Sequence, residues 1–127
     1  MRTRILFPAL VLGLVACSAP SGSGAPTSSA PSADAIEVSV ADFMIDPSAL
    51  EVAGPTVTIS VTNDGPTPHN LTVRDVDGTV LAGTDDLSVG GSETITAELE
   101  PAEYTIFCAL AGHESLGMSG TLTVTAP

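Results

Sequence analysis

Residues 56–62, Thr-Val-Thr-Ile-Ser-Val-Thr, alternate strictly between polar and apolar side chains. Successive side chains of a β-strand point to opposite faces, so the two valines and the isoleucine share one face. The same period of two returns through most of the chain after residue 35. It predicts half-buried strands around these further inward-facing residues: Ile36, Val38 and Val40; Leu71 and Val73; Ile95, Ala97 and Leu99; Tyr104 and Ile106; Leu122 and Val124.

Turn-forming residues separate these segments. The turns are Asn63-Asp64-Gly65, Asp77-Gly78, Gly90-Gly91 and Pro101. Weaker strand patterns at residues 50–52 and 79–81 bring the expected number of strands to seven or eight. Many short strands at regular spacing predict an all-β fold, an antiparallel β-sandwich of the Greek-key type. Residues 109–119 are the one segment of the body that fits no strand.

The first 16 residues have the pattern of a bacterial export signal. Two arginines lie in the first four positions, and the apolar run that follows is about twelve residues, too short to span a bilayer core of roughly 30 Å. The run ends in Leu14-Val15-Ala16-Cys17, which resembles a bacterial lipobox. The resemblance implies cleavage before Cys17 and a diacylglycerol on its sulfur. An ordinary secretory signal with an incidental cysteine is the alternative.

Residues 17–34 are predicted to link this anchor to the folded domain. After Cys17 they are almost entirely Ser, Gly, Ala, Pro and Thr, and they contain no large apolar side chain. Such a segment cannot bury enough surface to fold, so it is interpreted as a flexible tether. Residues 35–127 then form one domain, which we expect to be monomeric and to face the periplasm or the cell exterior.

Charge excludes one class of function. The chain of 127 residues has three arginines, no lysine and fifteen acidic residues, for a net charge of −12. Without the first 16 residues, one arginine and all fifteen acidic residues remain, for a net charge of about −14. A body this acidic is repelled by phosphate backbones, so nucleic-acid binding is excluded.

Cys108 is left without a cysteine partner if Cys17 carries a lipid. A single free thiol in an oxidising compartment is either buried and inert or bound to a metal. From Cys108 the chain continues Ala-Leu-Ala-Gly-His113-Glu-Ser-Leu-Gly-Met118, so thiolate, imidazole and thioether recur at intervals of five. Five residues turn a helix by about 500°, so these groups cannot share a helical face. A loop with two glycines can bring them together.

His69 is the only other histidine, and it has the alternation phase of Leu71 and Val73, so it is predicted to point into the sandwich. Cys108 has the inward phase of Ile106. A lone inward histidine is usually a core residue. Two histidines with a cysteine and a methionine at regular spacing instead favour a metal. Two imidazoles, a thiolate and a weak thioether are the donor set of blue copper.

At these residues the chain resembles the cupredoxin family of plastocyanin-like small blue copper proteins. The pattern is Tyr104-Thr-Ile-Phe-Cys-x₄-His-x₄-Met-x-Gly-x-Leu-x-Val124, with Pro68-His69-Asn70 about forty residues upstream. The two four-residue spacings are similar to those of the rusticyanin and sulfocyanin group. The similarity covers roughly residues 35–125.

The resemblance implies roles for individual residues. His69, Cys108 and His113 become the equatorial ligands of one Cu(I)/Cu(II) ion, and Met118 becomes the axial ligand. Asn70 matches the family position whose side chain ties the first-ligand strand to the cysteine loop. Met44 has no metal-binding neighbour in the sequence, so we expect it to pack in the core.

The implied function is electron transfer between redox proteins, such as a cytochrome or an oxidase or reductase, at a membrane surface. Electrons would leave through the edge of His113 in an apolar patch formed by Leu110, Ala111 and Leu116; ordinary loop packing is the other interpretation of these residues. The acidic surface could steer a basic partner or serve solubility alone. Because four protein ligands leave no open metal position, no enzyme is expected. Two alternatives stay open, namely a copper-binding or copper-delivery protein and a metal-free interaction domain.

Overall fold

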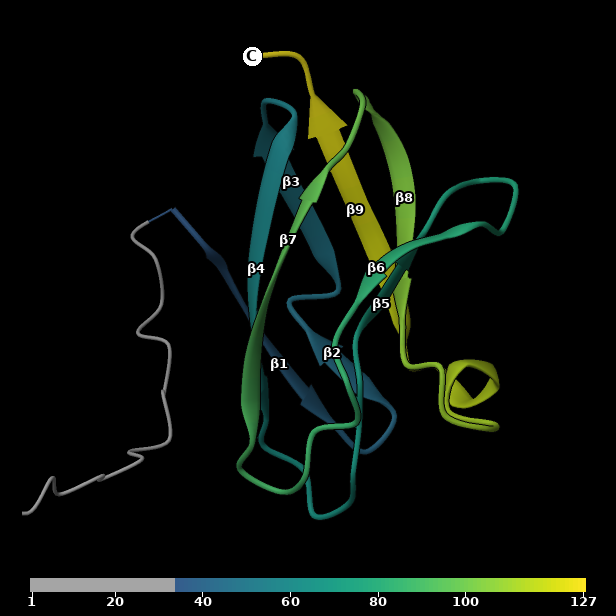
Figure 1. Cartoon of the computed structure of the whole chain (residues 1–127). Helices are drawn as coiled ribbons and strands as arrows, with labels where there is room; N and C mark the ends of the chain where they lie inside the picture. The colour runs from purple at the N-terminus through teal and green to yellow at the C-terminus, as the bar shows by residue number, and fades with distance from the viewer. Residues whose placement is uncertain (1–33) are drawn as a thin grey trace, which may run out of the picture.

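A computed structural model describes residues 34–127 (Figure 1). The expected signal peptide, the lipid on Cys17 and the linker up to residue 33 lie outside the described residues and stay predictions. No helix within 34–127 is long and apolar enough to cross a membrane. The elements of this part are β1 (Ile36–Ala41), β2 (Met44–Asp46), β3 (Ala49–Ala53), β4 (Thr56–Asn63), β5 (Thr72–Arg74), β6 (Val80–Gly83), β7 (Ser92–Glu98), β8 (Ala102–Phe107), the 3-10 helix η1 (Glu114–Leu116) and β9 (Ser119–Thr125).

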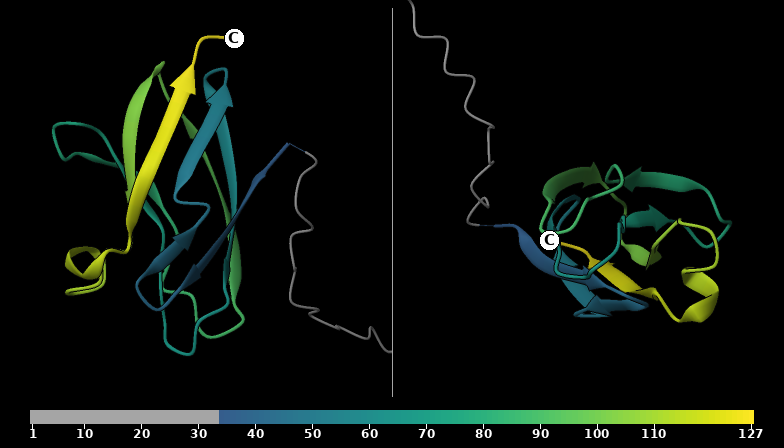
Figure 2. Two further views of the ribbon diagram at one scale, coloured as in Figure 1. Left: turned by 180° about the vertical axis from the view of Figure 1, so that it is seen from behind. Right: turned by 90° about the horizontal axis from the view of Figure 1, so that it is seen from below.

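The strands form two sheets, which lie face to face as two layers (Figure 2). One sheet has the strand order β2-β1-β4-β7, and the other has the order β3-β9-β8-β5-β6. The predicted β-sandwich is therefore confirmed. The described residues contain nine strands, against the seven or eight expected, because β2 had no pattern of its own.

The sheets are mixed, which corrects the expectation of a purely antiparallel sandwich. β1 runs parallel to β4, with Ile36 opposite Ile59, and β3 runs parallel to β9, with Ala49 opposite Thr121. Between β1 and β4 the chain leaves the first sheet for the second and then returns. Alternation reports which face of a strand is buried, but it carries no information on the direction of its neighbour.

Most of the residues predicted to face inward form one core between the sheets, whereas Ile36 and Ala97 are only partly buried against it. Burial of each such aliphatic side chain contributes about 1.5–3 kcal/mol. The core packs against the strands that lead to the site and so fixes their separation. Those of its members with 1% of their surface exposed or less are Val40, Ile59, Val61, Leu71, Val73, Ile106, Cys108, Met118 and Leu122.

Two neighbouring strands position the candidate ligands. β5 and β8 are antiparallel, and Thr72 lies opposite Phe107. The start of β5 therefore lies beside the end of β8. This register places His69, just before β5, next to Cys108, just after β8.

Met44 was expected in the core, and that prediction is wrong. Met44 is 53% exposed, whereas Ile45, the next residue of β2, is 4% exposed. Neighbouring residues of a strand point to opposite faces, so the burial of Ile45 turns Met44 to solvent.

Candidate metal centre

The candidate ligands come from two segments at one end of the sandwich, the residues before β5 and the loop between β8 and β9. His69 is fully buried and forms an isolated β-bridge with Leu87. In this bridge the His69 N–H donates to the Leu87 carbonyl at 3.2 Å, and the Leu87 N–H donates to the His69 carbonyl at 2.7 Å. Cys108 follows β8 directly, His113 precedes η1, and Met118 precedes β9.

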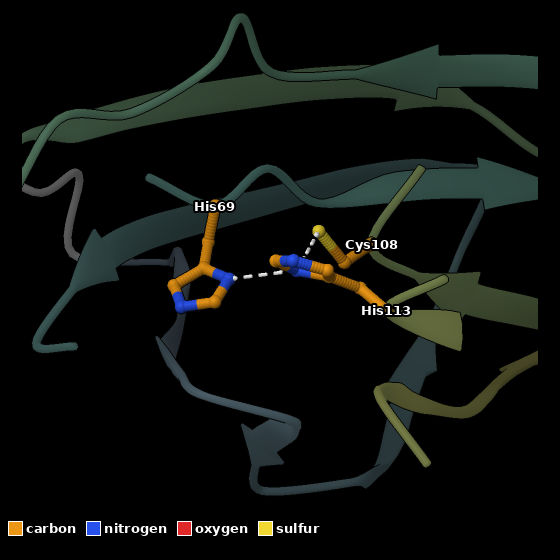
Figure 3. A group of neighbouring side chains, drawn as sticks. All are labelled: His69, Cys108 and His113. Atoms are coloured by element: carbon orange, nitrogen blue, oxygen red, sulfur yellow. Dashed lines mark hydrogen bonds between the residues drawn. The ribbon is translucent and has the colours of Figure 1, made fainter. Parts of the chain in front are cut away.

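Figure 3 shows the side chains of His69, Cys108 and His113 pointing toward one another. The two Nδ1 atoms of the histidines are 3.2 Å apart, and Cys108 Sγ lies 3.5 Å from His113 Nδ1. One ligand atom from each of the three residues lies within 4.8 Å of the others. Donors bound to one metal ion at about 2.0–2.3 Å in a trigonal plane are roughly 3.5–4 Å apart. The three donors are therefore close enough to share one metal ion, with the two Nδ1 atoms slightly nearer to each other than bound ligands would be.

Met118 is brought to the same place by the backbone of its loop. The Met118 N–H donates to the carbonyl of His113 at 3.1 Å, and the Met118 carbonyl accepts from the N–H of Cys108 at 3.1 Å. Gly117, at the end of η1, has φ +105°, a left-handed conformation in which glycine carries no steric penalty. The loop thus closes on itself and buries Met118 completely.

A family model described as a cupredoxin-like domain matches residues 7–124. The chain belongs to this cupredoxin family. His69, Cys108, His113 and Met118 lie near one another and fit a single type 1 copper site, in which soft sulfur donors accompany two imidazoles. The free, fully buried thiol of Cys108 is the donor in this set that selects a soft metal.

Solved structures share the fold. The Na-dithionite-reduced auracyanin of the photosynthetic bacterium Roseiflexus castenholzii is 23% identical, with a TM-score of 0.66 over 75% of this chain and 99% of that one. Auracyanin B is 23% identical, with a TM-score of 0.67 over 76% and 91%. A purple cupredoxin of Nitrosopumilus maritimus is 23% identical, with a TM-score of 0.52 over 71% and 99%. At these identities the likeness concerns the fold alone. A search of curated proteins gave no match.

Asn70 of the cupredoxin joins the two ligand-bearing segments. Its side-chain Oδ1 accepts a hydrogen bond from the N–H of Ala109 at 2.7 Å, and its Nδ2 donates to Asp86 at 2.8 Å. Ala109 is the residue after the cysteine. Asn70 therefore holds the start of the ligand loop against the segment that carries His69.

Two residues that the sequence did not single out contact the far side of the His69 ring. His69 Nε2 lies 3.0 Å from the Asp42 carboxylate, and the Thr67 hydroxyl donates to the same carboxylate oxygen at 2.7 Å. The hydrogen bond from Thr67, followed by that from His69, lowers the pKa of Asp42 below its ordinary value. No motif marks Asp42, because its contact depends on where the turn after β1 lies.

Arg74 is a second contact that the sequence did not reveal. Its guanidinium lies over the ring of Phe107, 4.3 Å from the ring centroid, and forms a two-pronged ion pair with Glu114. Glu114 follows His113 directly in the chain. Arg74 thus connects β5 to the loop that carries His113.

His113 reaches the surface of the cupredoxin, unlike His69. It is half-buried and lines an open hollow of about 500 Å³ together with Phe43 and Leu110. Phe43 lies edge-on to the His113 ring, with the ring centroids 5.5 Å apart. Of the expected apolar patch, Leu110 is half-buried against the core, whereas Ala111 and Leu116 are exposed on the same loop.

Proposed function

We propose that this cupredoxin carries single electrons through one type 1 copper ion, which His69, Cys108, His113 and Met118 would hold. The observation that carries the proposal is the free, buried thiol of Cys108 within 4.8 Å of two imidazoles. Bound copper supplies a one-electron Cu(II)/Cu(I) couple.

The protein's part is to hold the donors in one arrangement for both oxidation states. His69 is fixed by its β-bridge with Leu87, and the Met118 backbone is tied to both Cys108 and His113. Ligands placed by packing and backbone hydrogen bonds move little when the metal charge changes. The small rearrangement keeps electron transfer fast.

Burial isolates this centre from water on the core side. Leu71 and Ile106 are fully buried in the core that backs the site. An apolar shell limits solvent access and lowers the local dielectric, which tunes the potential of a bound metal. Because four protein donors leave no open coordination position for a substrate, we infer a carrier and not an enzyme.

We further propose that electrons enter and leave at His113. Its ring is half-buried at the open hollow, and the patch of Leu110, Ala111 and Leu116 lies on the same loop. A redox protein such as a cytochrome, an oxidase or a reductase would dock there. A lipid on Cys17 would keep the carrier at a membrane surface outside the cytoplasm, in keeping with the N-terminal sequence.

Copper delivery is the rival function, and the half-buried position of His113 at the open hollow supplies the release route that it needs. The two functions differ in how firmly the metal is held. We expect copper-loaded protein to show a reversible one-electron couple and fast electron self-exchange, and to keep its Cu(I) through hours of exposure to bathocuproine disulfonate. Release of Cu(I) to this chelator within minutes, with slow self-exchange, would favour delivery and overturn electron transfer.

A further inference from the structure

The turn between β1 and β2 presents two side chains to the two histidines. Ala41 pairs with Met44 across this hairpin, so Asp42 and Phe43 alone form the turn. Phe43 has φ +59°, a left-handed conformation that usually requires glycine or asparagine. A bulky side chain at such a position carries strain of about 1–3 kcal/mol. The turn therefore keeps a strained phenylalanine at a position where glycine or asparagine would carry less strain.

Asp42, the other residue of the turn, reaches His69. Its Oδ1 lies 3.0 Å from His69 Nε2, and the Thr67 hydroxyl lies 3.3 Å from the same nitrogen. A Cβ on Gly65 would come within 3.1 Å of His69 Nε2 and 2.9 Å of Ala41 Cα. Only glycine at 65 lets the backbone pass this close. Asp42, Thr67 and Gly65 all lie near Nε2, and His69 has none of its surface exposed.

These contacts determine which ring nitrogen carries the proton. An ionised carboxylate can only accept hydrogen bonds, and the Thr67 hydroxyl donates its one proton to Asp42. The His69–Asp42 contact therefore requires a proton on Nε2. In the neutral ring Nδ1 is then bare, and Nδ1 is the atom that faces His113 and the candidate metal position.

We propose that Asp42 is a positioning residue for the metal centre. It holds His69 as the Nε2–H tautomer with Nδ1 free to bind, and its negative charge, transmitted through the imidazole, stabilises the more positive oxidised metal and lowers the reduction potential. The part that concerns potential rests on the proposed electron-carrier function. The part that concerns the tautomer and metal affinity does not.

Two variants separate these effects in the full chain. Asp42→Ala removes both the acceptor and the charge, whereas Asp42→Asn removes the charge and keeps an oxygen that can accept from Nε2–H. Asp46→Asn is the control, because it removes the same charge from an exposed position on the same hairpin.

The first measurement is the tautomer of His69 in metal-free protein, from ¹⁵N chemical shifts and long-range ¹H–¹⁵N couplings. Wild-type protein, Asp42→Asn and Asp46→Asn are expected to hold the Nε2–H form, and Asp42→Ala a mixture. A mixture in the wild-type protein, or an unchanged tautomer in Asp42→Ala, would overturn the assignment.

The second measurement uses Co(II) as the binding probe and copper for the potential. Loss of an outer partner of a ligating histidine typically lowers metal affinity by about 10–100-fold, and we expect this for Asp42→Ala. Asp42→Asn should bind Co(II) within about tenfold of wild type while its copper potential rises clearly more than that of Asp46→Asn. Equal potentials in the two Asn variants would overturn the charge effect. If the copper form proves redox-inactive, the proposed function fails, while the tautomer and Co(II) results still decide the role of Asp42.

Discussion

The two histidines of this site are held in opposite ways. His69 is fully buried, is paired through its backbone with Leu87, and has its outer nitrogen against Asp42. His113 is half-buried on a loop and reaches an open hollow, with the edge of Phe43 beside its ring. One ligand is therefore part of the sandwich, while the other is carried by a closing loop. His69 therefore provides fixed geometry, and His113 provides access from the surface.

Cys108 links the two regions, because it directly follows the core strand β8 and begins the loop that carries His113. Replacing it with serine removes the thiolate and should abolish intense absorption by the copper form entirely. Burial of the new hydroxyl should cost about 1–3 kcal/mol of unfolding free energy, which leaves the fold intact by circular dichroism. Cys17→Ser is the matched control and should keep the full colour. A coloured Cys108→Ser protein would remove Cys108 from the site.

Replacing each histidine in turn with glycine tests the difference between them. His113→Gly should leave a gap at the open hollow that added imidazole fills, with recovery of most of the wild-type absorption. His69→Gly should recover far less, because none of the His69 surface is exposed. Absorption titrations with imidazole measure both, after circular dichroism confirms folding. Equal rescue of the two variants would show that their settings do not differ.

Breaking the ion pair of Arg74 and Glu114 tests how the loop that carries His113 is held in place. This pair is partly exposed, so its loss is worth about 1 kcal/mol or less. Glu114→Gln should release copper to a chelator up to about fivefold faster, and the difference from wild type should shrink in high salt. Glu103→Gln, an exposed acid on neighbouring β8, should release copper at the wild-type rate. A salt-independent effect, or an equal effect of both variants, would contradict this role.

Among the changes around His113, loss of the Phe43 ring should have the smallest effect, a slight shift of the reduction potential. Phe43→Ala uncovers one edge of His113, admits water and so stabilises the more charged oxidised copper. The reduction potential should fall slightly, by less than Asp42→Asn raises it. Voltammetry measures the shift, and Met44→Ala, an exposed neighbour, should show none. A fall as large for Met44→Ala would show that the contact with His113 is irrelevant.

The sequence predicted much of the fold because burial of one face leaves a period of two. It also predicted the inward direction of His69 and Cys108, since both follow the phase of their strands. It did not predict β2, whose three residues contribute only Ile45 to the core. Nor did it predict the parallel pairings, since pairing direction depends on how the chain crosses between sheets.

The candidate ligands could be recognised in the sequence because a cysteine, two histidines and a methionine are rare and regularly spaced. Their outer partners could not. Asp42 lies 27 residues from His69, and Arg74 lies 40 residues from Glu114, so each contact exists only once the sandwich has formed. Acidic residues are also common throughout this chain, and nothing local distinguishes Asp42 from the others.

We propose above that Cys108 and two histidines hold one copper ion through a thiolate. Titration of the protein with Cu(II), followed by visible absorption and electron paramagnetic resonance, tests it most directly. We expect one copper per chain, an intense blue or green thiolate-to-copper charge-transfer band, and reversible bleaching by ascorbate. Pale d–d bands alone, or no stoichiometric binding, would show that Cys108 is not a ligand and that the protein has no thiolate–copper centre.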